Sequence, residues 1–309
     1  MANLVSSVDC PPRVCIVILN WNGLEDTVEC LESLQNVVYP NYDIVLVDNG
    51  SEGNDVEVLR NVFGDHMHII ENDINYGFAE GCNIGMRYAL SGTNPDYILL
   101  LNNDVVVDPS FLTEMVKVAD SDVQVGIVGP KTYFYSEPSR IQSAGGRINW
   151  WTGQTSLVGC TQIDNGGFDE VKEVDWMVGC ALLVRRMVIE KVGWLYSGYF
   201  AYFEETELCA RARKAGYRVL YAPRARIWHK RRLPPGRIDG FRLHQMTRNR
   251  FLFMKRNSTR PQLLSFFVCF FLKDVPLTLW SLLARQRDFK FVPRYFRSIW
   301  DGVVLAVKG

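Results

Sequence analysis

The chain has 309 residues, of which 48% are hydrophobic and 12% aromatic, so we expect a large buried core and exclude an intrinsically disordered protein. Its 34 basic and 34 acidic side chains cancel to a formal net charge of +0, and we expect no nucleic acid among its partners. The length accommodates one substantial α/β domain with an appendage, or two modest domains.

The charges are distributed unevenly along the chain. Residues 1–184 carry 8 basic against 26 acidic side chains, whereas residues 185–260 carry 19 against 5. This contrast favours two surfaces with different partners over ordinary solvated charged faces. The eight cysteines form no C-x-x-C pair and no signal peptide is recognisable, which together predict a cytoplasmic protein with reduced thiols.

Short apolar segments rich in β-branched residues alternate with segments of helical periodicity in the first hundred residues. We predict strands and helices in alternation: strands at Val14–Leu19, Tyr42–Val47, Met67–Ile70 and Tyr97–Leu101, and helices over 24–36 and 79–90. Buried strands that alternate with helices predict an α/β fold with a mostly parallel sheet and helices on both faces.

Polar side chains follow three of these strands, at Asn20-Trp21-Asn22, at Asp48 and at Asn102-Asn103-Asp104. In parallel sheets, ligands bind beyond the carboxyl ends of the strands, so this edge is where we expect the site. Asp104 is the first candidate for chemistry, because carboxylate oxygens there suit a hard divalent cation such as Mg²⁺ or Mn²⁺. An Asn/Asp turn before a helix that starts at Asp108-Pro109 remains the alternative.

The second half of the chain is less regular. We predict these elements: a strand over Met177–Val184, a helix within Tyr199–Arg213, a strand at Tyr217–Leu220 and an extended segment at Arg226–Trp228. The Pro234-Pro235-Gly236 run is typical of a linker, and after it the composition becomes basic, aromatic and helical. We therefore expect one domain over 1–232 and a helical carboxy-terminal region over 233–309.

Three acidic residues, Glu204, Glu205 and Glu207, follow an aromatic run at 199–203. Acids in the first turn of a helix complement its dipole, and this explanation stays open. Carboxylates beside aromatic side chains can also have the raised pKa that a general base requires. His229, at the end of the extended segment, becomes a candidate ligand only where it converges with Asp104.

The stretch Asn75–Gly85 spaces three glycines and two asparagines at an expected helix start. Glycine lets the backbone approach a ligand closely, and helix amino termini favour phosphate and polar ribose groups. The glycine order is not the G-x-G-x-x-G of dinucleotide-binding proteins, and a tightly packed helix entry is the alternative.

Taken in chain order, these motifs resemble those of the family 2 glycosyltransferases, which have the GT-A fold, and especially their bacterial rhamnosyltransferase-like branch. The resemblance covers roughly residues 13–232. On the nucleotide side, Val14–Gly23 and Val45–Ser51 resemble the two strands whose ends contact the base in the family, Asn75–Gly85 resembles the element that lines the nucleoside, and Leu99–Asp104 resembles the metal-binding D-x-D. On the acceptor side, the similar segments are Trp176–Arg186, Phe203–Arg211, which is similar to the F-E-D-x-D-L base motif, and His229, which matches a metal-binding histidine of some members.

The chain departs from the family pattern at two motifs. Asn102 stands where D-x-D has its first aspartate, so Asp104 should be the main charged ligand of the metal. Glu205 and Glu207 stand where the base motif has aspartates, which moves each carboxylate by one methylene. If Glu205 is misplaced, Glu204 or Glu207 is the alternative base.

The resemblance implies a metal-dependent transferase that inverts the anomeric carbon. Asp104 and His229 would hold Mg²⁺ or Mn²⁺ against the leaving diphosphate, and Glu205, beside Glu204, would take the proton of the acceptor hydroxyl. The donor would be dTDP-rhamnose or a UDP-sugar, and the acceptor a saccharide or lipid-linked molecule of cell-envelope polysaccharide synthesis. The implied donor contacts are Asn20, Asn22, Asp48, Asn75, Gly77, Asn83, Asn102, Asn103 and Arg185, with Arg186 as a further candidate.

The carboxy-terminal region interleaves aromatic and leucine side chains with cations. Such helices either lie in a membrane interface or pack on the catalytic domain or on a second subunit, and both interpretations stay open. Its longest apolar stretch, Leu263–Ala284, is interrupted by Lys273-Asp274 and Pro276, so we do not expect it to span a bilayer. A nucleotidyltransferase and a catalytically silent sugar-nucleotide-binding protein are the rival functions.

Overall fold

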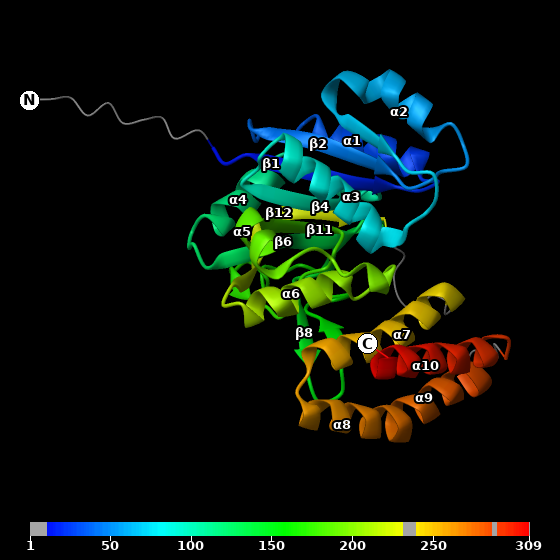
Figure 1. Ribbon diagram of the computed structural model, residues 1–309. Helices are drawn as coiled ribbons and strands as arrows, with labels where there is room; N and C mark the ends of the chain where they lie inside the picture. The colour runs from blue at the N-terminus through cyan, green and yellow to red at the C-terminus, as the bar shows by residue number, and fades with distance from the viewer. Residues whose placement is uncertain (1–10, 231–238, 286–288, 309) are drawn as a thin grey trace, which may run out of the picture.

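The computed structural model describes residues 11–230, 239–285 and 289–308, and it contains a large mixed sheet with helices on both faces (Figure 1). The strands are β1 Val14–Asn20, β2 Tyr42–Asp48, β3 His68–Glu71, β4 Tyr97–Asn102, β5 Val105–Val107, β6 Val125–Phe134, β7 Glu137–Ser143, β8 Gly146–Asn149, β9 Gln154–Leu157, β10 Lys172–Glu173, β11 Ala181–Arg185 and β12 Arg218–His229. The helices of this part are α1 Leu24–Leu34, α2 Asp55–Phe63, η1 Gly64–His66, α3 Gly77–Gly92, α4 Phe111–Ala119, α5 Arg186–Val192, η2 Ser197–Tyr199 and α6 Glu204–Lys214.

The sheet has the order β10-β12-β6-β11-β4-β1-β2-β3, and β5 and β7 pair with β12 and β6. Strands β3, β2, β1 and β4 are parallel to one another, and β12 is parallel to β6. Only β11, between β4 and β6, runs against both of its neighbours. The prediction of a mostly parallel sheet flanked by helices is therefore confirmed.

Two apolar cores fill the space between the sheet and its helices, because successive side chains of a strand point to opposite faces. Cys15 and Val17 of β1 belong to the core that α3 and α6 cover. Val14, Ile16 and Ile18 belong to the opposite core, which α1, α2 and α4 cover. The continuous apolar run of β1 is thus explained by burial on both faces.

The structure changes two of the predicted strands. Strand β11 begins at Ala181 rather than Met177, and residues 177–180 form a loop, of which 178–180 border the pocket described below. The segments predicted separately at 217–220 and 226–228 form one strand, β12, with a register shift between Ala222 and Arg226. Pro223 lies at that shift, and proline has no N–H to give to the ladder, so a local irregularity is expected there. The single strand carries His229 to its carboxyl end.

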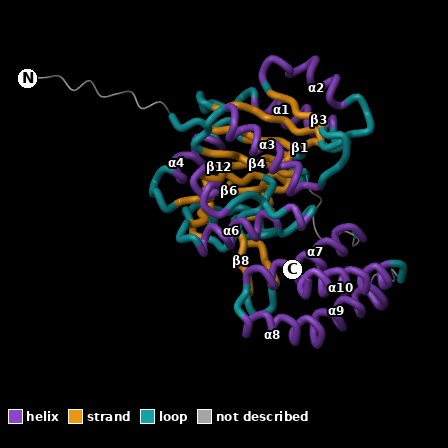
Figure 2. The backbone as a smooth tube through the Cα atoms, in the orientation of Figure 1, coloured by secondary structure: helices purple, strands orange, loops and turns teal. Residues whose placement is uncertain are grey.

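After residue 238 the chain forms a group of helices beside the sheet domain (Figure 2). These are α7 Gly240–Asn257, α8 Arg260–Cys269, the π-helix η3 Phe270–Asp274, α9 Val275–Trp280, the π-helix η4 Ser281–Arg285 and α10 Phe291–Lys308. The predicted linker at 234–236 and the domain boundary near 233 lie outside the described residues. Helix α7 packs on α10 and also contacts the sheet domain, where Phe253 lies 5.5 Å from the ring of Phe203.

Candidate functional site

The expected site residues gather at one edge of the sheet because of the strand directions. Asn20 of β1 is paired with Asp48 of β2, and Asn102 of β4 ends at the same edge. Strand β11 is antiparallel to both β4 and β6, and β12 is parallel to β6, so β12 has the same direction as β4. His229, at the carboxyl end of β12, therefore lies at the same edge, opposite Val105. Residues separated by more than a hundred positions are thereby brought together.

A buried hydrogen-bond network joins the ends of β1, β2 and β4. The amide of Asn20 donates to Asp48 Oδ1 at 2.8 Å and to Asp55 Oδ2 at 3.0 Å, and its Oδ1 accepts from the hydroxyl of Thr27 at 2.9 Å. Asn103 donates to the same hydroxyl at 2.9 Å. We call Asn20, Asp48 and Asn103 the strand-end network. Asn20 is fully buried and its side-chain amide is fully hydrogen-bonded, so it positions Asp48. This corrects the prediction that Asn20 contacts the nucleotide.

A second set of amides extends this edge toward α3. Asn49 donates to Asn75 Oδ1 at 2.9 Å and to the carbonyl of Gly77 at 3.2 Å. Gly77 has φ 83°, and a Cβ there would meet the ring of Phe200 at 2.5 Å, so glycine is required at this helix start. Asn22 lies on the exposed side, where its Oδ1 accepts from the N–H of Glu52. The bonds of Asn49 tie the segment before α3 to the end of β2.

Two predicted contacts with the donor are corrected by the structure. Asn83 is buried, and both ends of its amide bond to the backbone of Leu195, at 2.8 and 3.1 Å, so it joins α3 to the segment before η2. Arg185 pairs with Tyr97, at the amino end of β4, because β11 is antiparallel. There its guanidinium donates to the carbonyls of Ala119 and Val125, at the edge opposite the site. Arg186 starts α5 at that same edge.

Five of the predicted residues share one pocket of about 350 Å³, which we call the carboxylate pocket. They come from three separate segments of the chain, and they are Asn102, Asp104, Glu204, Glu205 and His229. The turn at 178–180 and the side chains of Phe78 and Tyr202 complete the wall. A Cβ on Gly179 would lie 3.3 Å from the Cβ of Glu205, so this glycine leaves room for that carboxylate at the wall.

Asp104 and His229 meet within this pocket. Asp104 Oδ1 lies 3.2 Å from His229 Nε2, within ion-pair distance, and on the ring's other side Nδ1–H donates to Gln142 Oε1 at 2.7 Å. Burial lowers the pKa of His229, but Cys180 and Asp104 outweigh it and raise that pKa to about 10. Burial likewise opposes ionisation of Asp104, whose pKa is nevertheless lowered by His229 and Asn102.

The donor atoms of this corner fit a divalent cation. Asn102 Oδ1 and Asp104 Oδ1 are buried oxygens without a hydrogen-bond partner among the described residues, and such atoms are uncommon in native proteins. Gln142 fixes the ring of His229 so that Nε2 faces Asp104, as outer partners of metal-binding histidines do. In the described part of the chain no group of three His, Cys, Asp or Glu side chains gathers as a complete metal site. Oxygens of a bound substrate would therefore have to complete the coordination.

The three glutamates of α6 have different environments. Glu204 is buried, its Oε2 has no hydrogen-bond partner in the described chain, and burial followed by the charge of Glu205 raises its pKa well above the ordinary value. Glu205 lines the pocket. Glu207 faces away, where Arg211 binds it at 2.7 Å and Arg256 approaches at 3.4 Å. The alternative that Glu207 serves as a base therefore has no geometric support.

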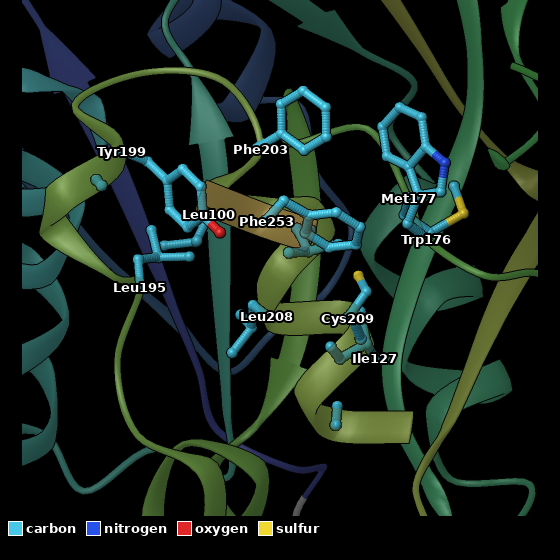
Figure 3. Close-up of a cluster of buried hydrophobic side chains, with 14 of the residues drawn as sticks. Leu100, Ile127, Trp176, Met177, Leu195, Tyr199, Phe203, Leu208, Cys209 and Phe253 are labelled. Carbon is cyan, nitrogen blue, oxygen red and sulfur yellow. The ribbon is translucent and has the colours of Figure 1, made fainter. Parts of the chain in front are cut away.

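The segment before α6 has an unusual backbone. Phe200, Tyr202 and Phe203 have φ of 59°, 68° and 77°, in the left-handed region where a residue with a side chain is strained by about 1–3 kcal/mol. Figure 3 shows the aromatic rings of Tyr199 and Phe203 in the apolar cluster around α6, beside Phe253. Aromatic packing thus helps to hold a strained turn directly before Glu204, and such strain is common at functional sites.

The sequence did not reveal two residues that shape the pocket. Gln142, in β7, had no pattern that linked it to His229, and only the pairing of β7 with β6 brings it there. Tyr202 lines the pocket from the strained turn, and its position in an aromatic run before the glutamates was the one available signal.

The chain is similar in sequence to known proteins. The sequence profile described as Glycosyl transferase family 2 matches residues 15–193. The chain is 26% identical over 242 residues to the low-salt glycan biosynthesis hexosyltransferase Agl10 of Haloferax volcanii, covering 77% of this chain and 74% of that protein. It is 25% identical over 222 residues to the rhamnosyltransferase WbbL of Escherichia coli K12, covering 67% of this chain and 80% of that one.

Solved structures share the fold at lower identity. GalNAc-T7, crystallised with UDP, GalNAc and Mn²⁺, matches with a TM-score of 0.62 at 16% identity, over 78% of this chain and 48% of its own. Residues 1–349 of S. aureus TarS, in complex with UDP-GlcNAc, match with a TM-score of 0.61 at 11% identity, over 95% and 81% of the two chains.

Proposed function

The chain belongs to glycosyltransferase family 2 and has the GT-A fold, and from this premise we propose that it transfers a hexose, such as rhamnose, from a dTDP- or UDP-sugar with inversion at the anomeric carbon. The acceptor in this proposal is a saccharide or lipid-linked molecule of cell-envelope synthesis, in keeping with relatives named as a glycan hexosyltransferase and a rhamnosyltransferase. Membership of the family replaces the nucleotidyltransferase alternative.

The observation that carries the proposal is the convergence of Asp104, His229 and the carboxylates of Glu204 and Glu205 in one pocket. These side chains come from the turn after β4, from β12 and from α6, and the sheet is what brings these segments together. A purely structural ion pair of Asp104 and His229 would not need a second pair of carboxylates across the same cavity. The donor would lie over the strand-end edge, near Asp48, Asn75 and Gly77, with its sugar over the pocket.

In the proposed reaction, Glu205 removes the proton of the acceptor hydroxyl, and the freed oxygen attacks the anomeric carbon. The bond from that carbon to the diphosphate breaks on the opposite face, which inverts the configuration. The two carboxylates differ in environment, because burial and the charge of Glu205 raise the pKa of Glu204 well above its ordinary value. We assign the base to Glu205, which lines the pocket and stands where the family motif has its aspartate.

Asp104 and His229 would hold a divalent cation, Mg²⁺ or Mn²⁺, with Asn102 Oδ1 as a neutral third ligand. When bound, such a cation neutralises negative charge on the leaving diphosphate, which is worth several kcal/mol in other enzymes. The protein's own contribution is to hold the two charged ligands in a buried corner, with Gln142 fixing the imidazole ring. Solved relatives of the same fold that contain Mn²⁺ with a nucleotide support this choice.

The test is a panel of nucleotide sugars assayed by thermal shift, in Mn²⁺ and in a chelator, followed by a measurement of donor consumption. We expect dTDP- and UDP-sugars to raise the melting temperature only with the cation, and the best donor to be consumed when acceptor is supplied. Binding without any transfer or hydrolysis would favour the catalytically silent sugar-nucleotide-binding protein, which Asn102 in place of an aspartate motivates. An absence of stabilisation by every nucleotide sugar would contradict the proposal.

We further propose a cytoplasmic location with peripheral membrane contact through the carboxy-terminal helices; a homo-oligomer stays open. The helix over 260–284 is long and apolar enough, by length and composition alone, to cross a membrane. Apolar side chains lie both on the face that packs on the protein and on the exposed face. One face packs inward through Phe266 and Phe270, while Leu264, Leu272 and Trp280 are more than half exposed. A helix that is apolar all round favours an apolar environment for its outer face.

Vesicle binding tests this contact. Leu272 is 77% exposed, so Leu272→Glu should leave the fold intact and weaken binding to anionic vesicles, whereas Val123→Glu, at 75% exposure in the sheet domain, should not. Salt should weaken binding as well, because nearby cations attract the headgroups. Equal behaviour of the two variants, or no binding by the unchanged protein, would favour a surface that packs on protein.

A further inference from the structure

One buried side chain of the carboxy-terminal region binds the strained turn before α6. Asn249 of α7 is fully buried, and its amide donates to the carbonyls of Tyr199, Ala201 and Tyr202 at 3.0, 2.8 and 2.8 Å. Its neighbour Arg248 adds a bond to the carbonyl of Gly198 at 2.9 Å. Two consecutive side chains of α7 therefore bind four carbonyl groups of the turn, those of residues 198, 199, 201 and 202.

The same turn is held from its other side by the start of α3. The N–H groups of Phe78 and Ala79 donate to the carbonyl of Phe200 at 2.6 and 3.2 Å. Gly77, whose φ is 83°, allows this approach, because a side chain there would collide with Phe200. The turn is thus clamped between the element expected to line the donor and a helix of the carboxy-terminal region.

These contacts bear directly on the carboxylates. Phe203 precedes α6 in a left-handed conformation and has no side-chain cap of its own, so the direction of the first helical turn depends on how residues 199–203 are held. Glu204 and Glu205 are the first two residues of that helix. A left-handed backbone at Phe200 and Tyr202 relaxes when its carbonyls lose their partners, and the carboxylates would move with it.

We propose that Asn249 is a positioning residue for the transfer reaction: by binding three carbonyls of the strained turn, it sets where Glu204 and Glu205 stand in the carboxylate pocket. Through Asn249, helix α7 then supports the reaction site and is not merely an appended module. The statement about the reaction rests on the proposed function, whereas the statement about the turn does not. Arg248, through Gly198, has a smaller share in the same task.

The matched control is Asn257, near the end of the same helix. It is also buried, but its amide donates to the carbonyl of Phe253 within α7, so it has no part in the turn. Asn249→Ala should lower kcat by roughly 10–100-fold with little change in donor affinity, because a displacement of about 1 Å can cost that much. Asn257→Ala should leave kcat near the original value. Asn249→Asp, which has the same shape but no N–H to donate, should be at least as damaging as Asn249→Ala.

Hydrogen exchange supplies a readout that does not depend on transfer. Asn249→Ala should raise amide exchange in residues 198–207 about tenfold or more, while Asn257→Ala should not. A chain that proves inactive as a transferase but shows this exchange pattern would refute the proposed function and keep the positioning of the turn. Unchanged exchange and unchanged kcat in Asn249→Ala would overturn the inference. If that variant does not fold, Arg248→Ala, which removes the bonds of Arg248 to the carbonyl of Gly198, to Asn249 Oδ1 and to Gln245, should show the same two changes at smaller size, and their absence would overturn the inference.

Discussion

The strand-end network and the carboxylate pocket lie at the same edge of one sheet, yet their polar groups are treated differently. In the network, Asn20 bonds to Asp48, Asp55 and Thr27, and Asn103 bonds to Thr27. In the pocket, single oxygens of Asn102, Asp104 and Glu204 are buried with no hydrogen-bond partner in the described chain. The hydrogen bonds of the network are complete, whereas the pocket contains buried oxygens whose hydrogen bonds are not.

The difference separates scaffold from reaction site. Nearly all buried polar groups in native proteins are hydrogen-bonded, and an exception needs an explanation such as an absent ligand or ion. The saturated network fixes the turn after β1 and the end of β2, and in the proposed function the donor would meet this preformed surface. The unpaired oxygens of the pocket would be available to the proposed cation and acceptor. Substitutions in the two regions should therefore affect different quantities: stability in the network, and catalysis or ligand affinity in the pocket.

The largest effect is expected at Glu205. Glu205→Gln removes the proposed base and should lower transfer by about 10²–10⁴-fold, roughly 3–5 kcal/mol, with donor affinity near the original value. Glu207→Gln is the control, because Glu207 is buried between Arg211 and Arg256 and should affect stability more than rate. Single-turnover transfer is the measurement, since slow product release could hide the defect. A dead Glu207→Gln beside an active Glu205→Gln would show that the assignment of the base is wrong.

The next effect is expected at Asp104. Asp104→Ala removes the charged ligand and should abolish the cation-dependent part of donor binding while the fold stays intact, because the metal interaction is worth several kcal/mol. The measurement is the donor-induced rise in melting temperature with Mn²⁺ and with chelator, which should become equal in the variant. A variant that still responds to Mn²⁺ as the original protein does would place the cation elsewhere.

In the strand-end network we expect a change of stability. Asn20→Ala removes bonds to Asp48, Asp55 and Thr27, of which Asp48 and Thr27 keep partners in Ser51 and Gly23. A buried group left unsatisfied, such as Asp55 Oδ2, costs about 1–3 kcal/mol. Chemical denaturation should show this loss, while kcat at saturating donor remains close to that of the original chain. A severe loss of kcat without a loss of stability would remove the distinction between scaffold and site at this position.

A smaller effect is expected at Gln142, which reaches the pocket only through His229. Gln142→Leu should weaken cation affinity by roughly 10–100-fold, as loss of an outer partner does in other metal sites. Titration with Mn²⁺ in the presence of donor measures this affinity. Unaltered affinity would mean that the orientation of the ring is set by packing alone.

The smallest effect concerns pH. Because the pKa of Glu204 is raised by burial, the folded chain binds a proton that the unfolded chain releases above pH ~4.3. Its contribution to stability is therefore present below that pH and is lost as pH rises toward the raised pKa. Glu204→Gln should flatten the decline of unfolding free energy over this window, measured by denaturation at several pH values. Parallel curves for the variant and the original chain would contradict the buried-acid interpretation.

The local patterns of the sequence predicted the strands and the polar residues at their ends, because a buried parallel strand must be apolar and its end must be polar. They did not predict the direction of β11, whose residues have the same apolar character in either orientation. The family resemblance implied Arg185 as a donor contact, whereas the antiparallel direction of β11 puts it at the opposite edge of the sheet. In the same way, the irregularity at Pro223 hid the fact that β12 is one strand that delivers His229.

The sequence by itself determined the chemistry that is present: an aspartate after β4, a histidine after a β-rich segment, and glutamates behind an aromatic run. Tertiary structure alone decided which of these groups lie close to one another and which have all their hydrogen bonds satisfied. Gln142 and Asn249 had no local pattern that marked them, because their importance lies in atoms 87 and about 50 residues away, His229 and the 199–202 carbonyls. Hydrogen bonds act over about 3 Å in space, and only the folded sheet brings such distant positions within that range.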